Sequence, residues 1–331
     1  MKAERIALTG DGSWATALVH VLTTNGQDIT WHVRTPHILT SVREKSLNCD
    51  YLGSLSLDTN HIKLTDNLEE AIESCDILYV VIPAAFIHQM FEGIPKEKLK
   101  GKKIVSAVKG MLPGFYVTPC TYFSEQCDIP LNNLAFISGP SHAEEVAMGR
   151  TTYLTALSID QQLATTIANI LRNETIITRP AADIAGAEYA TVLKNIMALS
   201  VGICHGLGHG DNLTAVLVAG AIREIEAFLN KKVPGERNIL DYLYTGDLLV
   251  TCYSQFSRNR TFGNMIGKGY SVKSAQMEMN MIAEGYNAVP AIIDIAGKLG
   301  INMPISETVY NILYKSVAPR SGIQQLIVNL H

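Results

Sequence analysis

The sequence predicts an α/β N-terminal domain with a doubly wound, mainly parallel sheet, followed by an all-α C-terminal domain. Strand-like runs alternate with helical runs up to about residue 180, a pattern typical of parallel sheets. From residue 183 onward only helical patterns occur. The 331 residues, of which 47% are hydrophobic and 18% charged, suffice for two domains with separate cores. We therefore expect a first domain at residues 1–180 and a second at 181–331.

The expected elements follow from the spacing of apolar residues and from Gly, Pro and Asn punctuation. Strands are expected at residues 6–9, 28–33, 62–65, 76–82, 103–108, 134–138, 153–157 and 175–178. Helices between them are expected at residues 14–22, 38–46, 68–72, 116–126 and 161–171. In the second domain, helices are expected at residues 184–204, 213–229, 236–244, 272–283, 288–298 and 306–316.

The overall composition argues against several classes of protein. A net charge of −4 provides no basic footprint for nucleic acid. The six cysteines form no CxxC pair and no Cys/His cluster with zinc spacing, so we expect no metal and a reducing compartment. The N-terminus MKAERIALTG lacks the apolar core of a signal peptide. We expect a cytoplasmic protein that is not integral to a membrane.

The stretch 183–206 predicts a helix that is buried on every side and forms the core of the second domain. Between residues 184 and 203 it carries only two charges, Glu188 and Lys194. Its length would suit a membrane span, but each of the two charges would cost about 2.5–3.5 kcal/mol there. Two interpretations of Lys194 stay open at this point. Its ammonium either reaches the surface along its apolar stem or is a buried functional group.

A glycine motif follows the first strand and precedes the first helix. Gly10-Asp11-Gly12-Ser13-Trp14-Ala15 fits the pattern G-x-G-x-x-G/A. Gly10 permits the tight turn, Gly12 lets the backbone approach a pyrophosphate, and Ala15 lets the helix pack close to the strand. The free N–H groups of the helix would hold the phosphates. The motif predicts a Rossmann domain that binds a dinucleotide, although the carboxylate of Asp11 is unexpected beside a pyrophosphate.

The end of the second strand bears on which dinucleotide is bound. NAD-specific sites usually place Asp or Glu about twenty residues beyond the glycine loop, whereas an arginine suits the 2′-phosphate of NADP. This chain has Arg34 there. We expect NADP(H) to be preferred and NAD(H) to be possible, because an arginine can also stack on adenine without choosing between them.

Further loops lie at the carboxyl ends of predicted strands, where open α/β sheets bind ligands. One places Lys109 after Val108. Another contains Gly139, Ser141 and Glu144, and its S-x-x-E spacing predicts a capping box that begins a helix.

In the second domain Asp247 follows Gly246, where it could be a simple helix cap or a functional carboxylate. The run Ser257-Arg258-Asn259-Arg260-Thr261-Phe262-Gly263 ends at a glycine, and its two arginines suit a bidentate grip on phosphate. A solvated basic loop is the alternative.

Taken together, these separate motifs resemble the bacterial type of NAD(P)-dependent glycerol-3-phosphate dehydrogenase. The resemblance extends over about residues 6–316 and includes Leu193-Lys194-Asn195 and Glu284-Gly285-Tyr286. It implies reversible reduction of dihydroxyacetone phosphate, a small phosphorylated triose, to sn-glycerol 3-phosphate for phospholipid synthesis. It also implies a homodimer, the usual state of that family. Asp11 and Ala15 depart from the family, which more often has a small or amide residue and a glycine there.

The resemblance also implies roles for individual residues. The catalytic residues would be Lys194 as general acid/base, with Lys109 and Asp247 completing the polar site. The cofactor would contact Gly10, Gly12, Ser13, Trp14, Arg34, Lys109, Ala143, Arg258, Ile282 and Glu284. The substrate would contact Lys109, Gly139, Ser141, Lys194, Asp247, Ser257, Arg258 and Asn259. The chemistry agrees, because a positioned ammonium can stabilise the charge that develops on a carbonyl oxygen during hydride transfer and donate its proton.

Two other functions compete with this interpretation. A related dehydrogenase could act on a 3-hydroxy acid or a sugar-acid phosphate, but an unphosphorylated substrate would not need the loop from Ser257 to Arg260. A non-enzymatic sensor of NAD(P)H would bind cofactor without turnover and would leave Lys194 without a role.

Overall fold

The computed structural model describes residues 4–279 and 283–330. The chain divides into two compact units. Unit 1 comprises Met1–Val108 and Pro119–Ile184, and unit 2 comprises Lys109–Thr118 and Ala185–His331. The expected boundary at residue 180 lies close to the end of unit 1 at Ile184. Residues 109–118, which we expected in the first domain, belong to unit 2.

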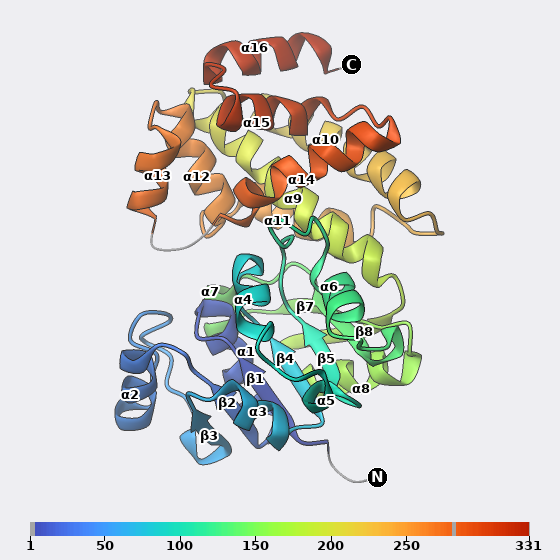
Figure 1. Ribbon diagram of the computed structural model, residues 1–331. Coiled ribbons are helices and arrows are strands. Elements are labelled where there is room, and N and C mark those ends of the chain that lie inside the picture. Colours follow the sequence, from blue (N-terminus) through green and yellow to red (C-terminus); the bar gives the residue numbers. More distant parts are fainter. Residues whose placement is uncertain (1–3, 280–282, 331) are drawn as a thin grey trace. The chain divides into compact units, whose positions relative to one another are not determined.

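Unit 1 is built on an eight-stranded sheet with the order β3-β2-β1-β4-β5-β6-β7-β8 (Figure 1). The strands are β1 (Ile6–Thr9), β2 (Ile29–His32), β3 (Ile62–Thr65), β4 (Ile77–Val80), β5 (Lys103–Ser106), β6 (Leu134–Ser138), β7 (Thr152–Leu157) and β8 (Ile176–Ala181). Neighbouring strands are parallel except β6 and β7, which are antiparallel. From β1 the chain builds outward first in one direction and then in the other, which confirms the predicted doubly wound, mainly parallel sheet.

Helices cover both faces of this sheet. Every residue of β1, β2, β4 and β6 is buried, and since side chains alternate between the faces, neither face of these strands is open to solvent. The helices of unit 1 are α1 (Ser13–Thr24), α2 (Pro36–Lys45), α3 (Leu68–Ser74), α4 (Ile87–Phe91), α5 (Lys96–Leu99), α6 (Pro119–Gln126), α7 (Ala143–Ala147) and α8 (Gln161–Leu171).

Unit 2 is helical. Its elements are α9 (Ile184–Gly206), α10 (Asp211–Lys232), the π-helical turn η4 (Tyr242–Gly246), α11 (Asp247–Tyr253), α12 (Arg258–Gly267), α13 (Val272–Glu278), α14 (Glu284–Leu299), α15 (Pro304–Tyr314) and α16 (Pro319–Asn329). The described residues from 185 to 330 contain no strand, so the predicted all-α character is confirmed. The single helix expected over 236–244 is wrong, because residues 234–241 form turns and coil before η4 begins.

Helix α9 is the core of unit 2, as its composition predicted. Every residue from 186 to 204 is buried, and the two charged side chains among them, Glu188 and Lys194, are 2% and 5% exposed. The hydroxyl of Thr118, in the segment Lys109–Thr118, donates a 2.6 Å hydrogen bond to the Glu188 carboxylate. A buried carboxylate therefore receives a donor from within the same unit, as a buried charge requires.

Helices α9 and α12 cross with their backbones in contact. A Cβ at Gly202 would lie 2.1 Å from a carbonyl oxygen of α12, and a Cβ at Gly263 would lie 2.2 Å from a carbonyl oxygen of α9. The same relationship repeats one turn later at Gly206 and Gly267. These paired glycines hold the first turn of α12, which carries the run from Arg258, against the helix that carries Lys194.

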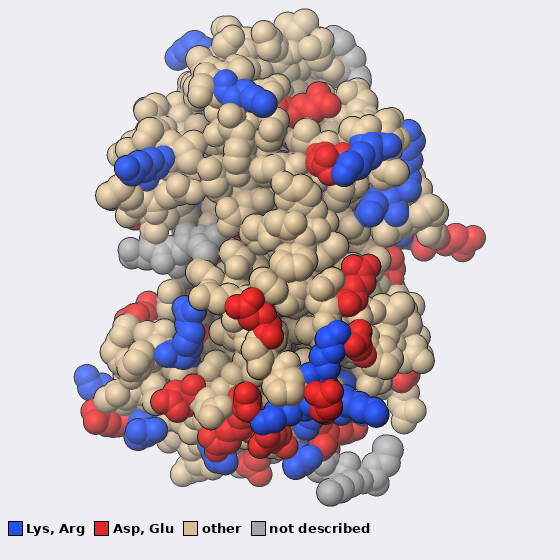
Figure 2. Space-filling view, in the orientation of Figure 1, with Lys and Arg blue, Asp and Glu red and all other residues tan. Residues whose placement is uncertain are grey.

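The surface charge and the composition of the helices can be compared with the expectation that the chain binds no nucleic acid and is not integral to a membrane. On the face drawn in Figure 2, lysine and arginine side chains lie among aspartate and glutamate side chains. Within residues 4–279 and 283–330, no helix combines the length and apolar character that spanning a bilayer demands.

Candidate active site

Lys194 projects from α9 into a buried polar cluster. Its Nζ lies 2.5 Å from Oδ1 of Asp247 and donates to the Thr251 hydroxyl at 3.0 Å. Because the lysine is only 5% exposed, the interpretation that it reaches the surface is wrong. None of the residues within one turn of Lys194 on α9 is acidic, so the anion that pairs with this lysine comes from α11.

The two partners of Lys194, Asp247 and Thr251, lie on one face of α11. Asp247 is the first residue of α11, directly after the π-helical turn η4, and is 2% exposed. Thr251 lies four residues later, so its side chain stands one turn from that of Asp247. The Thr251 hydroxyl donates to the Asp247 carbonyl at 2.6 Å, which leaves its lone pairs directed to the lysine.

A second lysine completes the cluster. The Nζ of Lys109 lies 3.3 Å from Oδ2 of Asp247, so the two carboxylate oxygens each face one ammonium. Asn195, the residue after Lys194, donates from Nδ2 to the Lys109 carbonyl at 2.7 Å. The segment Lys109–Thr118 is thereby tied to α9 within unit 2.

Burial and charge set the proton affinity of this cluster. Burial lowers the pKa of Lys194 to about 7, although Asp247 opposes the shift, and Lys109 contributes to it as a like charge. Burial alone would raise the pKa of Asp247, but the two lysines outweigh it and hold that pKa below its ordinary value. Asp247 therefore stays ionised, whereas Lys194 can gain or lose a proton near neutral pH.

The first turn of α12 lies close to the same part of α9. Ser257 is the N-cap of α12, and its hydroxyl accepts the Arg260 N–H at 3.3 Å. Asn259 Oδ1 accepts the N–H of Gly285 at 2.9 Å. A Cβ at Gly285 would lie 2.7 Å from the carbonyl oxygen of Asn195, so the starts of α12 and α14 meet α9 beside Lys194.

Two other predicted residues lie near this junction in sequence. Arg258 is the first residue of α12 and is exposed. Glu284 is the first residue of α14. Ile282, expected to contact cofactor, lies outside the described residues.

The glycine motif in unit 1 has the backbone that its residues predicted. Gly10 has φ +131°, and a Cβ there would lie 2.1 Å from the Val81 carbonyl oxygen. Gly12 is the N-cap of α1, and a Cβ there would have no atom within 4 Å. Ser13 begins α1, whose first turn contains no acidic residue.

Two observations indicate that this loop suits a dinucleotide. The positive end of the twelve-residue helix α1 faces the open side of Gly12, as a pyrophosphate requires. The indole Nε1 of Trp14, in the first turn, is buried and has no hydrogen-bond partner among the described residues. A buried donor without a partner is costly, and a ligand would satisfy it.

The structure accounts for Asp11, which was unexpected from the sequence. Its Oδ2 accepts the backbone N–H of Thr35 at 3.0 Å, so the carboxylate already has a partner at the end of β2. Thr35 follows Arg34, whose guanidinium lies 5.4 Å from the centre of the Phe86 ring. Asp11 thus links the glycine loop to the segment that carries Arg34.

The predicted capping box after β6 is wrong. The N-cap of α7 is His142, which makes no side-chain capping bond, and the Ser141 hydroxyl donates to the Gly139 carbonyl at 2.9 Å. Gly139 has φ +141°, and a Cβ there would lie 2.3 Å from the Tyr153 carbonyl oxygen. Ala143, expected to contact cofactor, begins α7 and is buried.

The predicted site residues therefore fall into two groups. Unit 2 brings together Lys109, Lys194, Asp247 and, through Asn195 and Gly285, Asn259. Unit 1 contains Gly10, Gly12, Ser13, Trp14, Arg34, Gly139, Ser141 and Ala143. Thr251, which contacts Lys194 directly, was missed, and its only signal in the sequence was its position four residues after Asp247.

A doubly wound unit with a dinucleotide loop and a helical unit with a buried lysine–aspartate pair define the class of nicotinamide-dependent dehydrogenases. The comparison with known families narrows this class. The descriptions "NAD-dependent glycerol-3-phosphate dehydrogenase N-terminus" and "C-terminus" match residues 5–164 and 183–324. The chain belongs to the NAD-dependent glycerol-3-phosphate dehydrogenase family.

Individual relatives match along nearly the whole chain. Proteins named glycerol-3-phosphate dehydrogenase (NAD(P)+) from Bacillus subtilis and Lactococcus lactis are 33% and 34% identical. The matches cover 98% and 99% of this chain and 94% and 96% of those relatives. A crystal structure of glycerol-3-phosphate dehydrogenase from Coxiella burnetii has a TM-score of 0.91 and 26% identity, with 98% of each chain covered.

Proposed function

We propose that this chain catalyses the reversible reduction of dihydroxyacetone phosphate to sn-glycerol 3-phosphate with NAD(P)H. Family membership supports the reaction. The buried contact of Lys194 with Asp247 and Thr251 is the observation that carries it, because reduction of a ketone needs a proton donor held in a dry, charged cluster.

Lys194 is assigned the proton transfer. When bound, the nicotinamide supplies the hydride that attacks the carbonyl carbon. As charge develops on the carbonyl oxygen, the Lys194 ammonium stabilises it and donates a proton to it. A pKa of about 7 leaves both protonation states accessible, so the same lysine can take the proton back in the oxidation direction.

Asp247, Lys109 and Thr251 are assigned the positioning of that lysine. Asp247 fixes Nζ at one carboxylate oxygen, while Lys109 occupies the other oxygen. The Thr251 hydroxyl accepts a hydrogen bond from the same ammonium, so two of the three N–H donors of Lys194 have protein partners. The third donor is left for substrate.

The start of α12 is assigned to the substrate phosphate. The exposed guanidinium of Arg258 can form a bidentate grip, and the N-terminal amides of α12 add positive potential. Ser257 and Asn259 lie in the same turn, and Gly139 and Ser141 are assigned to substrate from the family resemblance alone.

Arg34 is assigned the choice of cofactor. Its place at the end of β2 and its exposure suit the 2′-phosphate of NADP, so we propose that NADPH is preferred over NADH. Ser13, Trp14 and Ala143 are assigned to the rest of the cofactor, together with Glu284.

We also propose a homodimer in the cytoplasm that supplies glycerol 3-phosphate for glycerophospholipid synthesis. The dimer is assigned from the family resemblance alone. Light scattering after size-exclusion chromatography tests the dimer.

The activity is tested by following oxidation of NADPH with dihydroxyacetone phosphate, in parallel with unphosphorylated dihydroxyacetone and with NADH. The variant Lys194→Met is expected to lose turnover by about 10²–10⁴-fold while NADPH binding is retained. Lys298→Met is the matched control, because Lys298 forms an exposed ion pair with Asp294 at 2.7 Å in the same unit. Full turnover of Lys194→Met would reject the assignment of this lysine. Binding of NADPH without turnover of any substrate would favour the sensor.

A further inference from the structure

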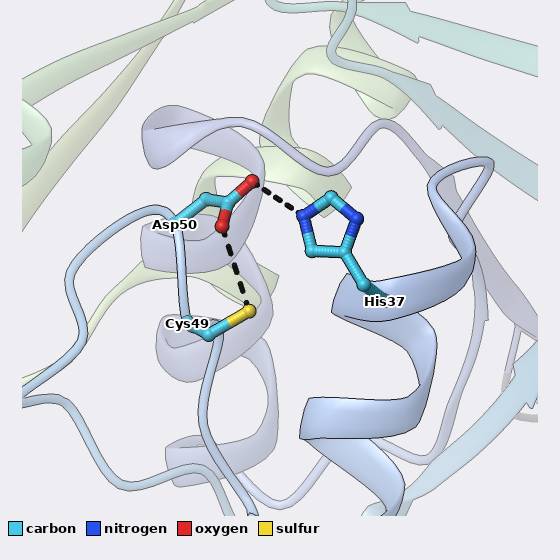
Figure 3. Close-up of side chains that lie close together, drawn as sticks. All are labelled: His37, Cys49 and Asp50. Carbon is cyan, nitrogen blue, oxygen red and sulfur yellow. Dashed lines mark hydrogen bonds and ion pairs between the residues drawn. The ribbon is translucent and has the colours of Figure 1, made fainter.

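Unit 1 contains a side-chain cluster that the proposed reaction does not use. His37 lies in the first turn of α2, and Cys49 and Asp50 lie in the loop that follows this helix (Figure 3). The His37 Nε2 lies 2.8 Å from Asp50 Oδ2, and the Cys49 thiol lies 3.5 Å from Asp50 Oδ1. One ligand atom from each residue lies within 4.8 Å of the other two.

The chemistry of these three atoms is selective. Imidazole nitrogen, thiolate sulfur and carboxylate oxygen are the ligand types of Zn²⁺, whereas Mg²⁺ and Ca²⁺ prefer oxygen alone. Three protein ligands leave a coordination position for water. All three side chains are exposed, so an ion can reach them from solvent. Cys49 is also the one exposed cysteine of the six in the chain.

The loop that carries two of the ligands is held in place beforehand. Asn48 is fully buried, and its side-chain amide donates to the Asp11 carbonyl at 2.9 Å and to the Thr16 hydroxyl at 2.8 Å. Its Oδ1 accepts the N–H groups of Asp50 and Tyr51 at 3.1 and 3.2 Å. Asn48 therefore fixes the backbone at the position where Cys49 and Asp50 present their side chains.

The other end of the cluster is fixed as well. The Ser41 hydroxyl, on α2, donates to the Leu47 carbonyl at 2.9 Å, so helix and loop are joined directly before the ligands begin. His37 lies one turn earlier on the same helix. The three ligands thus converge from two backbone segments that are each anchored by buried or half-buried hydrogen bonds.

We propose that His37, Cys49 and Asp50 bind a divalent transition metal of the Zn²⁺ type, which fastens the loop to α2. On binding, the Cys49 thiol loses its proton to solvent and the sulfur bonds to the metal, with no change in oxidation state. The hydrogen bonds that Asp50 forms with His37 and Cys49 are replaced by a bond from each of the three side chains to the metal ion. This inference does not depend on the proposed dehydrogenase reaction.

A nearby pair provides a matched control. His61 is a partly exposed histidine in unit 1, with Nδ1 2.6 Å from Asp28 and Nε2 3.9 Å from Asp58. It contacts its two carboxylates through opposite ring nitrogens, so these groups cannot surround a single ion. The variant His61→Ala therefore removes an exposed histidine–carboxylate contact without touching the proposed site.

Titration of the untagged, chelator-treated chain with Co²⁺ tests the proposal. A single equivalent is expected to produce visible d–d bands and a thiolate-to-cobalt charge-transfer band, both displaced by Zn²⁺. Cys49→Ser should abolish the charge-transfer band, and His37→Ala and Asp50→Asn should weaken binding, while His61→Ala should bind like the wild type. The proposal would be overturned if the wild type gave no thiolate-to-cobalt band. It would also be overturned if His37→Ala and His61→Ala weakened Co²⁺ binding equally.

A second measurement covers any variant that folds poorly. Zn²⁺ should slow the reaction of Cys49 with a thiol reagent in the wild-type chain, and Mg²⁺ should not. Zn²⁺ should also raise the melting temperature of the wild type and leave that of Cys49→Ser unchanged, because a ligand that binds only the folded state stabilises it. Equal reactivity of the thiol with and without Zn²⁺ would overturn the site on its own.

Discussion

Lys194 and Asp247, 53 residues apart in the sequence, form a buried ion pair in which Nζ lies 2.5 Å from Oδ1. The other carboxylate oxygen of Asp247 lies 3.3 Å from the Nζ of Lys109. Burial lowers the pKa of Lys194 to about 7 and outweighs Asp247, which raises it, while Lys109 adds a smaller lowering effect. A lysine with a pKa near neutrality suits the proton transfer that we propose for Lys194.

The two reaction directions should respond to pH in opposite ways. Reduction needs the Lys194 ammonium, so kcat/KM for dihydroxyacetone phosphate should fall about tenfold per pH unit above pH 7. Oxidation needs the neutral amine, so kcat/KM for glycerol 3-phosphate should rise through the same range and then level. The substrate phosphates titrate near about pH 6 and would move both profiles in the same direction. Parallel profiles would therefore contradict the role of Lys194.

Removing each charged neighbour should move the Lys194 pKa in a different direction. Asp247→Asn removes the charge that raises this pKa, so the midpoint of the residual reduction profile should fall by about 1–3 units. Lys109→Met removes a like charge, so the midpoint should rise. Lys298→Met, which removes an exposed charge away from the cluster, serves as the control. Shifts in the same direction for Asp247→Asn and Lys109→Met would show that the profile reports another group.

Local patterns were sufficient to predict several of these features. The glycine motif, the strand alternation and the buried helix around Lys194 each depend on residues close together in sequence. Local patterns do not predict contacts between segments that are distant in the sequence. The transfer of residues 109–118 to unit 2 and the contact of Thr251 with Lys194 follow from tertiary packing.

The errors have similar causes. Ser141 and Glu144 fit the capping-box spacing, but α7 begins at Ala143 with His142 as its N-cap, so Ser141 lies one residue too early to cap it. The polar run from Ser257 to Arg260 predicts a loop, but the buried residues of α12, which are Asn259, Phe262, Gly263 and Ile266, recur at helical spacing.

Arg258 should affect phosphorylated substrates only. A hydrogen bond to a charged group contributes about 1.5–3 kcal/mol, so Arg258→Ala should raise KM for dihydroxyacetone phosphate by about ten- to a hundredfold. Arg258→Lys keeps the charge but loses the bidentate geometry, and its KM should be intermediate. At saturating NADPH, the slow reaction with unphosphorylated dihydroxyacetone should change much less. Arg223→Ala, at an exposed position on α10, is the control, and an unchanged KM in Arg258→Ala would remove Arg258 from the phosphate site.

Asp11 should influence cofactor choice through Thr35. Asp11→Ala removes the acceptor of the Thr35 N–H and should weaken NADPH binding by about three- to tenfold, with a smaller effect on NADH. Asp11→Asn keeps an acceptor oxygen and should bind both cofactors much as the wild type does. Dissociation constants from cofactor fluorescence, with Arg34→Ala as reference, provide the measurement. Equal weakening of both cofactors in Asp11→Ala would mean that Asp11 acts on the glycine loop alone.

The contact between α9 and α12 should tolerate no side chain at Gly263. A Cβ there would lie 2.2 Å from the Leu199 carbonyl oxygen and 3.0 Å from the Ile203 nitrogen, both backbone atoms that cannot rotate away. Gly263→Ala should therefore force the helices apart and destabilise the chain by about 1–3 kcal/mol or more. Because α12 begins with Arg258, the same change should raise KM for the phosphorylated substrate.

A glycine elsewhere in unit 2 provides a control, because its replacement by alanine is expected to raise stability rather than lower it. Gly297 lies inside α14, is exposed, and would have no atom within 4 Å of an added Cβ. Gly297→Ala should stabilise the chain by about 0.4–1 kcal/mol, since alanine restricts the unfolded chain and favours helix. Urea denaturation followed by circular dichroism compares the two variants. If Gly263→Ala were as stable as Gly297→Ala, the backbones of α9 and α12 could not be in the close contact described above.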